Sequence, residues 1–223
     1  MDRKPVMTAT ANPMTAGIEI NKVLRNTYML LGMTLLFSAV TATAAMALNI
    51  SYIAGMVCSI VGFGLLFVVN RMADSSKGIV AIFAFTGFMG AGLGPLLNHF
   101  AGMANGPQLI MQALGGTAIV FFALSGYVLT TKKDFSFMGS FLAVGMVVAI
   151  IAMIALMFFN IPAASMALSA AIVLLMSGFI LFDTSRIIHG GETNYIRATV
   201  SLYLSIYNLF TNLLILLGLS SDD

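Results

Sequence analysis

Seven long apolar stretches run through this chain of 223 residues, and they constrain its fold more than any other feature. A membrane-spanning helix needs about 20 consecutive, mostly apolar residues. The seven stretches cover approximately residues 27–48, 51–69, 78–97, 108–131, 138–159, 163–188 and 198–219. Barrel strands would alternate apolar and polar residues, and these stretches do not. The sequence therefore predicts an all-α membrane protein, a bundle of seven transmembrane helices.

The chain carries too little charge to be soluble. It has 10 Lys and Arg residues and 8 Asp and Glu residues, or 8% of the sequence, where soluble proteins average about 25%. This composition excludes a soluble enzyme domain, a disordered chain and a nucleic-acid-binding protein. Cys58 is the only cysteine. The chain therefore forms no internal disulfide, and we expect the thiol to pack as a small apolar side chain.

The basic residues indicate how the helices are oriented. Cytoplasmic segments of membrane proteins carry an excess of Lys and Arg. All ten Lys and Arg residues of this chain lie in the N-terminal segment or beside the connections after the second, fourth and sixth spans. They are Arg3, Lys4, Lys22, Arg25, Arg71, Lys77, Lys132, Lys133, Arg186 and Arg197. We therefore expect a cytoplasmic N-terminus and a periplasmic C-terminus. Two regions are expected, a flexible cytoplasmic tail (residues 1–22) and a seven-helix transmembrane domain (residues 23–223).

The third span ends in a glycine-rich segment followed by Pro95. Gly90 and Gly94 form a small-xxx-small pair, which allows another helix to approach closely. The glycines and Pro95 also weaken the helix, so an unwound turn of the kind that lines transporter sites is the alternative.

Asp183 is the only acidic residue inside an apolar run. One interpretation is an ion pair near the helix end, because Arg186 follows three residues later and lies on the same face. The other is a titratable group on a path for protons or cations, since ionisable residues within a membrane commonly mark such paths. The sequence leaves both interpretations open.

The last span carries a polar stripe. At 100° per residue its four members fall within about 60° of one another. Polar side chains are costly to expose to lipid, so this face is expected to meet other helices or water. The stripe consists of Ser201, Ser205, Asn208 and Asn212.

Motifs of catalysis and metal binding are absent from the sequence. It has no HExxH zinc helix, no G-x-S-x-G nucleophile turn and no Walker sequence. Its two histidines, His99 and His189, fall on opposite sides of the membrane in the expected topology. We therefore expect no enzyme activity, no metal and no cofactor.

Three stretches resemble the Bax inhibitor-1 (transmembrane Bax inhibitor motif) family. They are residues 92–98 (GLGPLLN), 113–137 (ALGGTAIVFFALSGYVLTTKKDFSF) and 178–210 (GFILFDTSRIIHGGETNYIRATVSLYLSIYNLF). The resemblance extends from about Lys22 to Leu219. It implies a seven-helix bundle in which six helices surround a central C-terminal helix.

The resemblance also implies roles for particular residues. Family members that pass calcium have two facing acidic residues, one in the sixth helix and one in the seventh, which titrate as a pair and gate a pore. Asp183 matches the first position, and Ser205 stands at the second. A carboxylate and a hydroxyl cannot share a proton as two carboxylates do. Arg71 is a candidate by position for the arginine latch of those members.

Three functional hypotheses follow. Within the family, the chain resembles a bacterial inner-membrane protein that modulates the membrane-bound AAA+ protease FtsH. This implies a modulator that binds and inhibits such a protease, which would grip the flexible segment from Asp2 to Ile20. The alternative is a pH-sensitive leak channel for calcium, other cations or protons, built on Asp183 and the polar stripe. The third is a secondary transporter for a small solute, built on the glycine-rich third span.

Overall fold

All seven expected helices are present in the computed structural model, which describes residues 13–159 and 161–220. Of the described residues, 88% are helical and none lies in a strand. Seven helices in this part of the chain are long and apolar enough to cross a membrane. The protein is thus an all-α multi-pass membrane protein, as the sequence predicts. The elements are α1 (Pro13–Ala47), α2 (Tyr52–Met72), α3 (Lys77–Ala101), α4 (Gly106–Thr131), the 3₁₀ helix η1 (Ser136–Met138), α5 (Gly139–Phe158), α6 (Pro162–Ile188) and α7 (Tyr195–Leu219).

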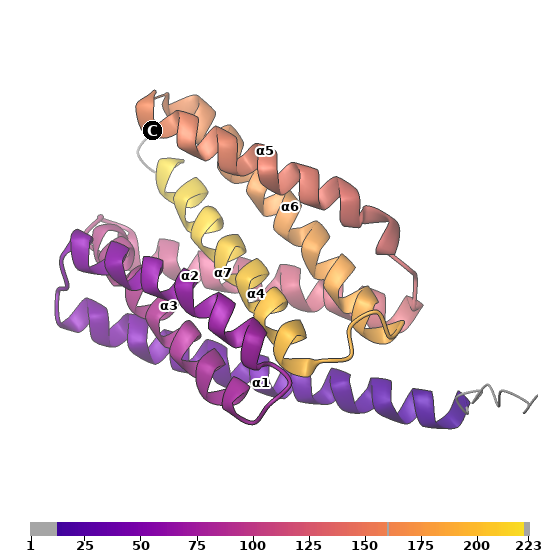
Figure 1. Cartoon of the computed structure of the whole chain (residues 1–223). Helices are drawn as coiled ribbons and strands as arrows, with labels where there is room; N and C mark the ends of the chain where they lie inside the picture. Colours follow the sequence, from indigo (N-terminus) through magenta and orange to yellow (C-terminus); the bar gives the residue numbers. More distant parts are fainter. Residues whose placement is uncertain (1–12, 160, 221–223) are drawn as a thin grey trace, which may run out of the picture.

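The C-terminal helix α7 is the centre of the bundle. It packs against α1, α2, α3, α4 and α6, and it runs between the α1–α3 group and the α4–α6 group (Figure 1). In the most apolar stretch of 18 residues in α7, 50% is buried inside the protein. The corresponding share is 11% in the span that contains α5. Leu202, Tyr203, Leu209 and Leu214 of α7 are fully buried. The central position expected for the last helix is confirmed.

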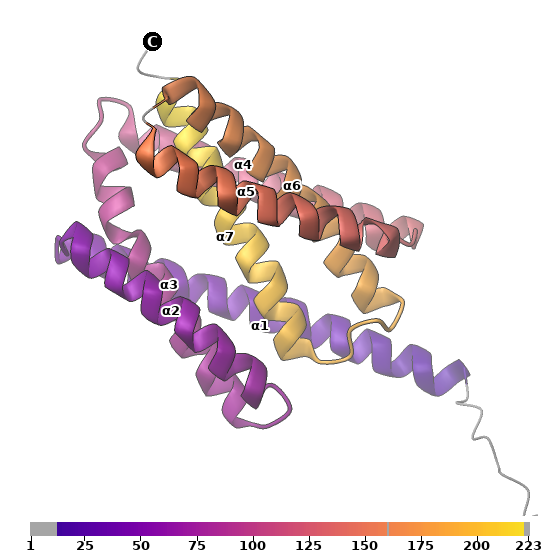
Figure 2. The ribbon, with the colours of Figure 1, turned by 45° about the horizontal axis from the view of Figure 1, so that its top comes forward.

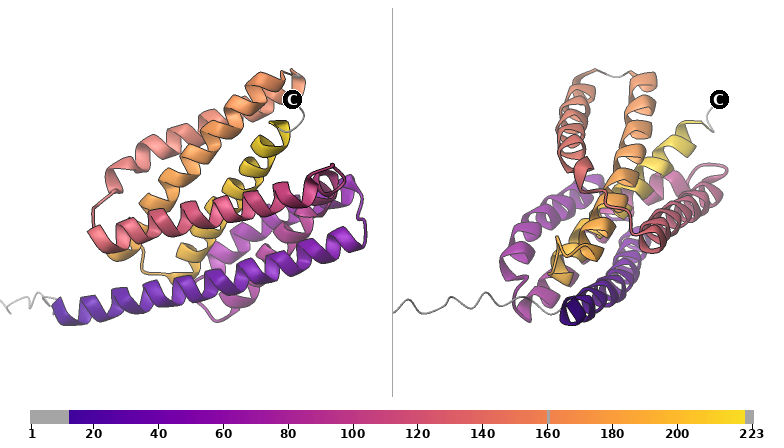
Figure 3. Two further views of the ribbon diagram at one scale, coloured as in Figure 1. Left: turned by 180° about the vertical axis from the view of Figure 1, so that it is seen from behind. Right: turned by 90° about the vertical axis from the view of Figure 1, so that its right-hand side faces the viewer.

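Helix α5 lies at the edge of the bundle. In the described residues it packs against α6 and η1, and five helices rather than six contact α7 (Figures 2 and 3). The sequence of α5 explains this position. Its residues are apolar on every side, with Ser140 as the one polar side chain. Such a helix is suited to lipid around most of its surface.

Local signals fix several helix ends. Ser51 caps α2, because its hydroxyl accepts a hydrogen bond from the backbone N–H of Ala54 at 3.2 Å. Lys132 ends α4 in the left-handed conformation, with φ of 52°. Pro107 and Pro162 lie in the first turns of α4 and α6. A helix tolerates proline there, because the N–H that proline lacks has no partner within the helix.

Helix α1 begins earlier than the hydrophobicity indicates. It starts at Pro13, so residues 13–22 of the expected flexible tail are helical. Residues 1–12 of that tail lie outside the described residues. A 35-residue helix is about 52 Å long, compared with about 30 Å for the hydrocarbon core. Hydrophobicity marks the edge of the membrane, whereas the helix continues past that edge and beyond the bundle (Figure 1).

The glycine-rich part of α3 packs closely against α1. Gly90 lies against the backbone carbonyl of Ser38. A Cβ atom on Gly94 would lie 2.6 Å from the Cβ of Ala45, closer than two carbon atoms can approach. The close helix packing expected of the small-xxx-small pair is confirmed. The alternative of an unwound turn is wrong, because α3 continues as a helix through Pro95 to Ala101. This removes the only support for the transporter hypothesis.

Candidate functional site

One end of the bundle gathers three connections, residues 73–76, 132–138 and 189–194, and the N-terminal part of α1. We call it the basic end. Hydrogen bonds join the three connections: Asn194 Nδ2 donates to the Ala73 carbonyl at 2.9 Å, and His189 Nε2 lies 3.2 Å from the Lys132 carbonyl. All the Lys and Arg residues in the described part of the chain lie here: Lys22, Arg25, Arg71, Lys77, Lys132, Lys133, Arg186 and Arg197.

Asp183 lies inside the bundle, between α6 and the central helix α7. It is 6% exposed and is the only buried charged residue in the described part of the chain. Its Oδ2 atom accepts a hydrogen bond from the Ser201 hydroxyl of α7 at 2.7 Å. A buried carboxylate needs such a partner, because leaving it unpaired in an apolar setting costs free energy. Asp183 therefore joins α6 to α7.

Arg186 does not form the ion pair with Asp183 that their spacing allows. Its Nη2 atom donates to the Gly191 carbonyl at 3.1 Å and lies 3.6 Å from a carboxylate oxygen of Glu192. The turn that follows α6 explains this choice. Gly190 has φ of +74°, a conformation that glycine adopts without strain, and the chain folds back so that residues 191 and 192 meet Arg186.

The polar stripe of α7 faces the interior as expected, although its members have different partners. Ser205 and Asn212 are buried. Asn208 Nδ2 donates to the Leu204 carbonyl and Asn212 Nδ2 to the Asn208 carbonyl, each at 2.8 Å and within α7 itself. Ser201 is the member that forms a hydrogen bond with another helix, through Asp183.

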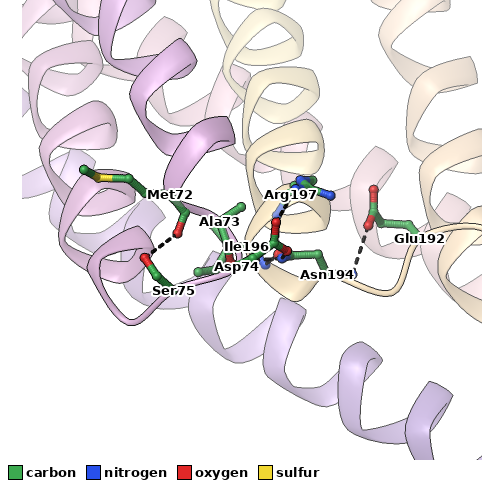
Figure 4. A network of polar contacts seen from close by, with 8 residues as sticks. All are labelled: Met72, Ala73, Asp74, Ser75, Glu192, Asn194, Ile196 and Arg197. Atoms are coloured by element: carbon green, nitrogen blue, oxygen red, sulfur yellow. Dashed lines mark hydrogen bonds and ion pairs between the residues drawn. The ribbon is translucent and has the colours of Figure 1, made fainter.

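The expected latch residue, Arg71, is exposed at the end of α2. A neighbouring group of residues connects α7 to the α2–α3 connection (Figure 4). Arg197 at the start of α7 contacts Asp74 of the α2–α3 connection at 2.7 Å. Asn194 Nδ2 donates to Asp74 Oδ1 at 2.8 Å and to the Ala73 carbonyl. These contacts tie the first residues of the central helix to the α2–α3 hairpin.

Asn194 was missed as a site residue, although the sequence carries a signal for it. Its Oδ1 atom accepts from the backbone N–H groups of Ile196 and Arg197 at 2.9 and 3.2 Å. Asn is a preferred residue immediately before a helix for this reason. The cap itself could be predicted from the sequence. The second role, holding Asp74 and Ala73, depends on a segment 120 residues away.

A second tie joins the end of α6 to the α4–α5 connection. The Ser185 hydroxyl accepts from the backbone N–H of Phe135 at 2.9 Å. It also lies 3.4 Å from Asp134 Oδ1. Hydrogen bonds from Ser136 hold the pKa of Asp134 below its ordinary value. Asp134 therefore stays ionised at the basic end across the physiological range.

A pair of hydroxyl groups links α1 to α7 deeper in the bundle interior. The hydroxyl groups of Ser38 in α1 and Tyr203 in α7 lie 2.8 Å apart. The Tyr203 hydroxyl also lies 3.4 Å from the Thr86 carbonyl of α3. Tyr203 is fully buried. It was not predicted as a site residue, because one tyrosine within an apolar span gives no distinct signal in the sequence.

A cavity at the basic end lies between α1 and the α6–α7 connection. Its volume is about 550 Å³, and Glu19, Lys22, His189, Glu192 and Tyr195 contribute to its walls. These side chains carry both signs of charge. The part of the chain that the structure describes contains no cluster of three or more His, Cys, Asp or Glu residues that could hold a metal ion.

The arrangement defines a class of protein: a polytopic seven-helix membrane protein with a central C-terminal helix and an intramembrane carboxylate that binds to it. The chain belongs to the family described as "Inhibitor of apoptosis-promoting Bax1", whose model matches residues 20–222. The family expected from the sequence is confirmed.

Comparison with individual proteins gives relatives of the same length. The chain is 51% identical to the Escherichia coli K12 protein named "Modulator of FtsH protease YccA", over the full length of both chains. It has the same identity and coverage with the Escherichia coli O6:H1 protein named "Inner membrane protein YccA". It is 50% identical to an "Uncharacterized membrane protein" of Vibrio cholerae, with 98% of each chain covered.

Proposed function

We propose that this chain is a bacterial inner-membrane protein that binds an FtsH-type membrane AAA+ protease and inhibits it. The observation that carries this proposal is the 51% identity, over the full length of both chains, to a protein named as a modulator of FtsH. The other Escherichia coli relative is named as an inner membrane protein, which supports the location. The role is one of binding rather than catalysis, and it uses no cofactor.

The N-terminal segment from Asp2 to Ile20 is the proposed contact with the protease. Residues 13–20 form the first turns of α1, and α1 projects past the rest of the bundle (Figure 1). An AAA+ protease engages an accessible end of its target and then pulls. Here the pull would meet a helix that is packed against α3, α6 and α7. A bundle that unfolds slowly would occupy the protease without being consumed.

This proposal requires a cytoplasmic N-terminus. The gathering of basic side chains at the basic end supports that orientation, because cytoplasmic segments carry the excess of Lys and Arg. The C-terminus is then periplasmic. Cysteine labelling tests this orientation: after Cys58 is replaced by Ala, single cysteines at Ser75 and Ser220 should react with a membrane-impermeant reagent from opposite sides.

The first experiment is a protease assay in reconstituted membranes. Purified FtsH-type protease digests a known membrane substrate with and without a molar excess of this protein. We expect slower cleavage of the substrate while this chain stays largely intact. Unchanged cleavage of the substrate would contradict the proposal.

A second experiment tests the N-terminal grip. Deleting residues 2–12 leaves the described part of α1 complete, and we expect this variant to inhibit less. The matched control keeps the length and composition of residues 2–12 but scrambles their order. Equal inhibition by the deleted and full-length proteins would exclude these residues as the grip. Loss of inhibition in the scrambled variant would mean that a specific sequence is recognised.

The leak channel has a weaker basis in this chain. The polar partner of Asp183 is the hydroxyl of Ser201, and the family's second acidic position holds Ser205. This arrangement has one carboxylate and lacks the coupled pair that titrates in the calcium-passing members. Flux of calcium or protons into liposomes tests it: a leak that Asp183→Asn abolishes would support a channel, and equal leaks would assign Asp183 a structural role.

A further inference from the structure

A groove runs along the membrane-facing side of the bundle, between α1 and α4. No Cα atom of α1 lies within 8 Å of a Cα atom of α4 in the described residues, and α7 forms the floor between them. Two hollows of about 260 and 310 Å³ make up the groove. They lie next to each other, because Leu35, Leu114, Thr117 and Ile206 line both. We call this feature the α1–α4 groove.

The groove has the length and polarity of a lipid chain. On α1 it extends from Tyr28 to Met46, about 27 Å at 1.5 Å per residue, which is close to the thickness of the hydrocarbon core. Most of its lining is apolar, and its rim includes the exposed side chains of Leu114 and Phe122. The groove therefore opens toward the bilayer.

The groove suits an acyl chain better than a partner helix. An α-helix with its side chains is at least about 10 Å wide, whereas an extended alkyl chain is much thinner and can lie deep between α1 and α4, against α7. The groove opens toward the bilayer, where acyl chains are the abundant apolar molecules. We therefore take an acyl chain as its occupant.

Two groups lie near the end of the groove closest to the basic end: Tyr28, which lines the groove, and Arg25, which precedes it on α1. The hydroxyl of Tyr28 is buried and has no hydrogen-bond partner in the described protein, although its ring packs against Phe121 at 5.9 Å between centroids. Buried hydroxyl groups normally have partners. One helical turn away is the exposed Arg25, whose guanidinium can pair with a phosphate.

We propose that the α1–α4 groove binds one acyl chain of an anionic phospholipid, with the Tyr28 hydroxyl donating to an oxygen at the glycerol or phosphate level and Arg25 pairing with the phosphate. The site is built by α1, α4 and α7 together. It is separate from the contact proposed for the protease, which uses the N-terminal residues beyond Arg25.

The test uses a photoreactive lipid. The full-length protein is reconstituted in phosphatidylcholine vesicles that contain a trace of phosphatidylglycerol with a diazirine on one acyl chain, and labelled peptides are mapped by mass spectrometry. We expect label to concentrate on α1 and α4 relative to α5, the most lipid-exposed helix. Equal labelling of α5 would overturn the proposal and leave the face to bulk lipid or a protein partner.

Glycines provide a matched pair of variants. A Cβ added at Gly32, in the groove, or at Gly64, on the exposed face of α2, would meet nothing within 4 Å. Gly32→Leu places a side chain in the groove at a position where the Cβ atom meets no protein atom. The selective labelling of α1 and α4 should therefore be lost, whereas Gly64→Leu should leave it unchanged. Ala118→Phe, also in the groove, is the second filling variant if Gly32→Leu folds poorly. Undiminished labelling in a folded groove-filled variant would refute the site.

The headgroup contacts are tested with a phosphatidylcholine probe that carries the same acyl chain. The anionic probe should label the groove more than this zwitterionic probe, and the difference should vanish in Arg25→Gln and shrink in Tyr28→Phe. The Tyr28→Phe variant should remain as stable as the parent protein, because its hydroxyl has no protein partner to lose. Equal labelling by the two probes in the parent protein would refute the anionic preference.

Discussion

Replacing Asn194 by Ala should weaken the bundle at the point where the central helix begins. The side chain has two functions. Its oxygen caps the N-terminus of α7, and its Nδ2 group binds the α2–α3 connection through Ala73 and Asp74. Both functions end in the alanine variant, so α7 loses its cap and its tether together.

The expected loss can be worked from the contacts. Replacing an Asn cap by Ala costs about 1 kcal/mol. The hydrogen bond from Nδ2 to the Ala73 carbonyl is part-buried and contributes about 1 kcal/mol. The contact with Asp74 is exposed and adds a few tenths of a kcal/mol. We therefore expect Asn194→Ala to lower the free energy of unfolding by about 2 kcal/mol.

The assay is unfolding in mixed micelles of a mild detergent and dodecyl sulfate, followed by circular dichroism. Asn194→Ser separates the two functions, because a serine can cap the helix but cannot reach Ala73. It should recover about half of the loss. Asp74→Ala controls for the ion pair with Arg197 and should cost less than about 1 kcal/mol, since both groups are exposed. If Asn194→Ala is as stable as the parent protein, or if the serine variant recovers nothing, the reasoning is wrong.

Three further predictions concern other parts of the bundle. Gly94→Leu should lower the unfolding free energy by about 1–3 kcal/mol in the same assay, because its Cβ would lie 2.6 Å from that of Ala45; a neutral variant would mean that α1 and α3 can separate freely. Tyr203→Phe should cost about 1 kcal/mol through loss of the bond to Ser38, and no change would show that this hydroxyl pair adds nothing. The pKa of Asp134 is lowered in the folded state, so its ionised carboxylate stabilises the fold fully above its unfolded pKa of about 4. This stabilisation is lost as the pH falls through the lower, folded value. Asp134→Asn should therefore make the unfolding free energy less sensitive to pH in this range, and an identical pH profile would exclude the effect.

The sequence was a reliable guide to the helices, because each span must satisfy its backbone hydrogen bonds internally and must present an apolar surface. It was less reliable at the start of α1, where the polar residues from Pro13 onward continue the helix beyond the membrane. Hydrophobicity reports the solvent around a residue and does not report where a helix begins. The glycine pair in α3 was interpreted correctly as a packing surface, since few side chains would fit there.

The candidate site was less accessible to sequence reasoning. Asp183 stood out as a lone acid in an apolar run, but its spacing to Arg186 suggested a pair that the structure does not form. The fold of the α6–α7 connection gives Arg186 a closer partner, Glu192, and the packing of α6 against α7 gives Asp183 the hydroxyl of Ser201. Partners on other elements cannot be read from spacing along one helix.

The sequence by itself determined that this chain crosses a membrane seven times and belongs with the Bax inhibitor-1 proteins, because both conclusions rest on local composition and on motifs contiguous in the chain. Only the tertiary structure decided which polar groups meet. Asp74 and Arg197 lie 123 residues apart along the chain, and Asn194 lies 121 residues from its partner Ala73. The α1–α4 groove exists because the backbones of α1 and α4 stay apart on either side of α7. Such contacts depend on how the helices pack around α7, and packing is a property of all seven helices together.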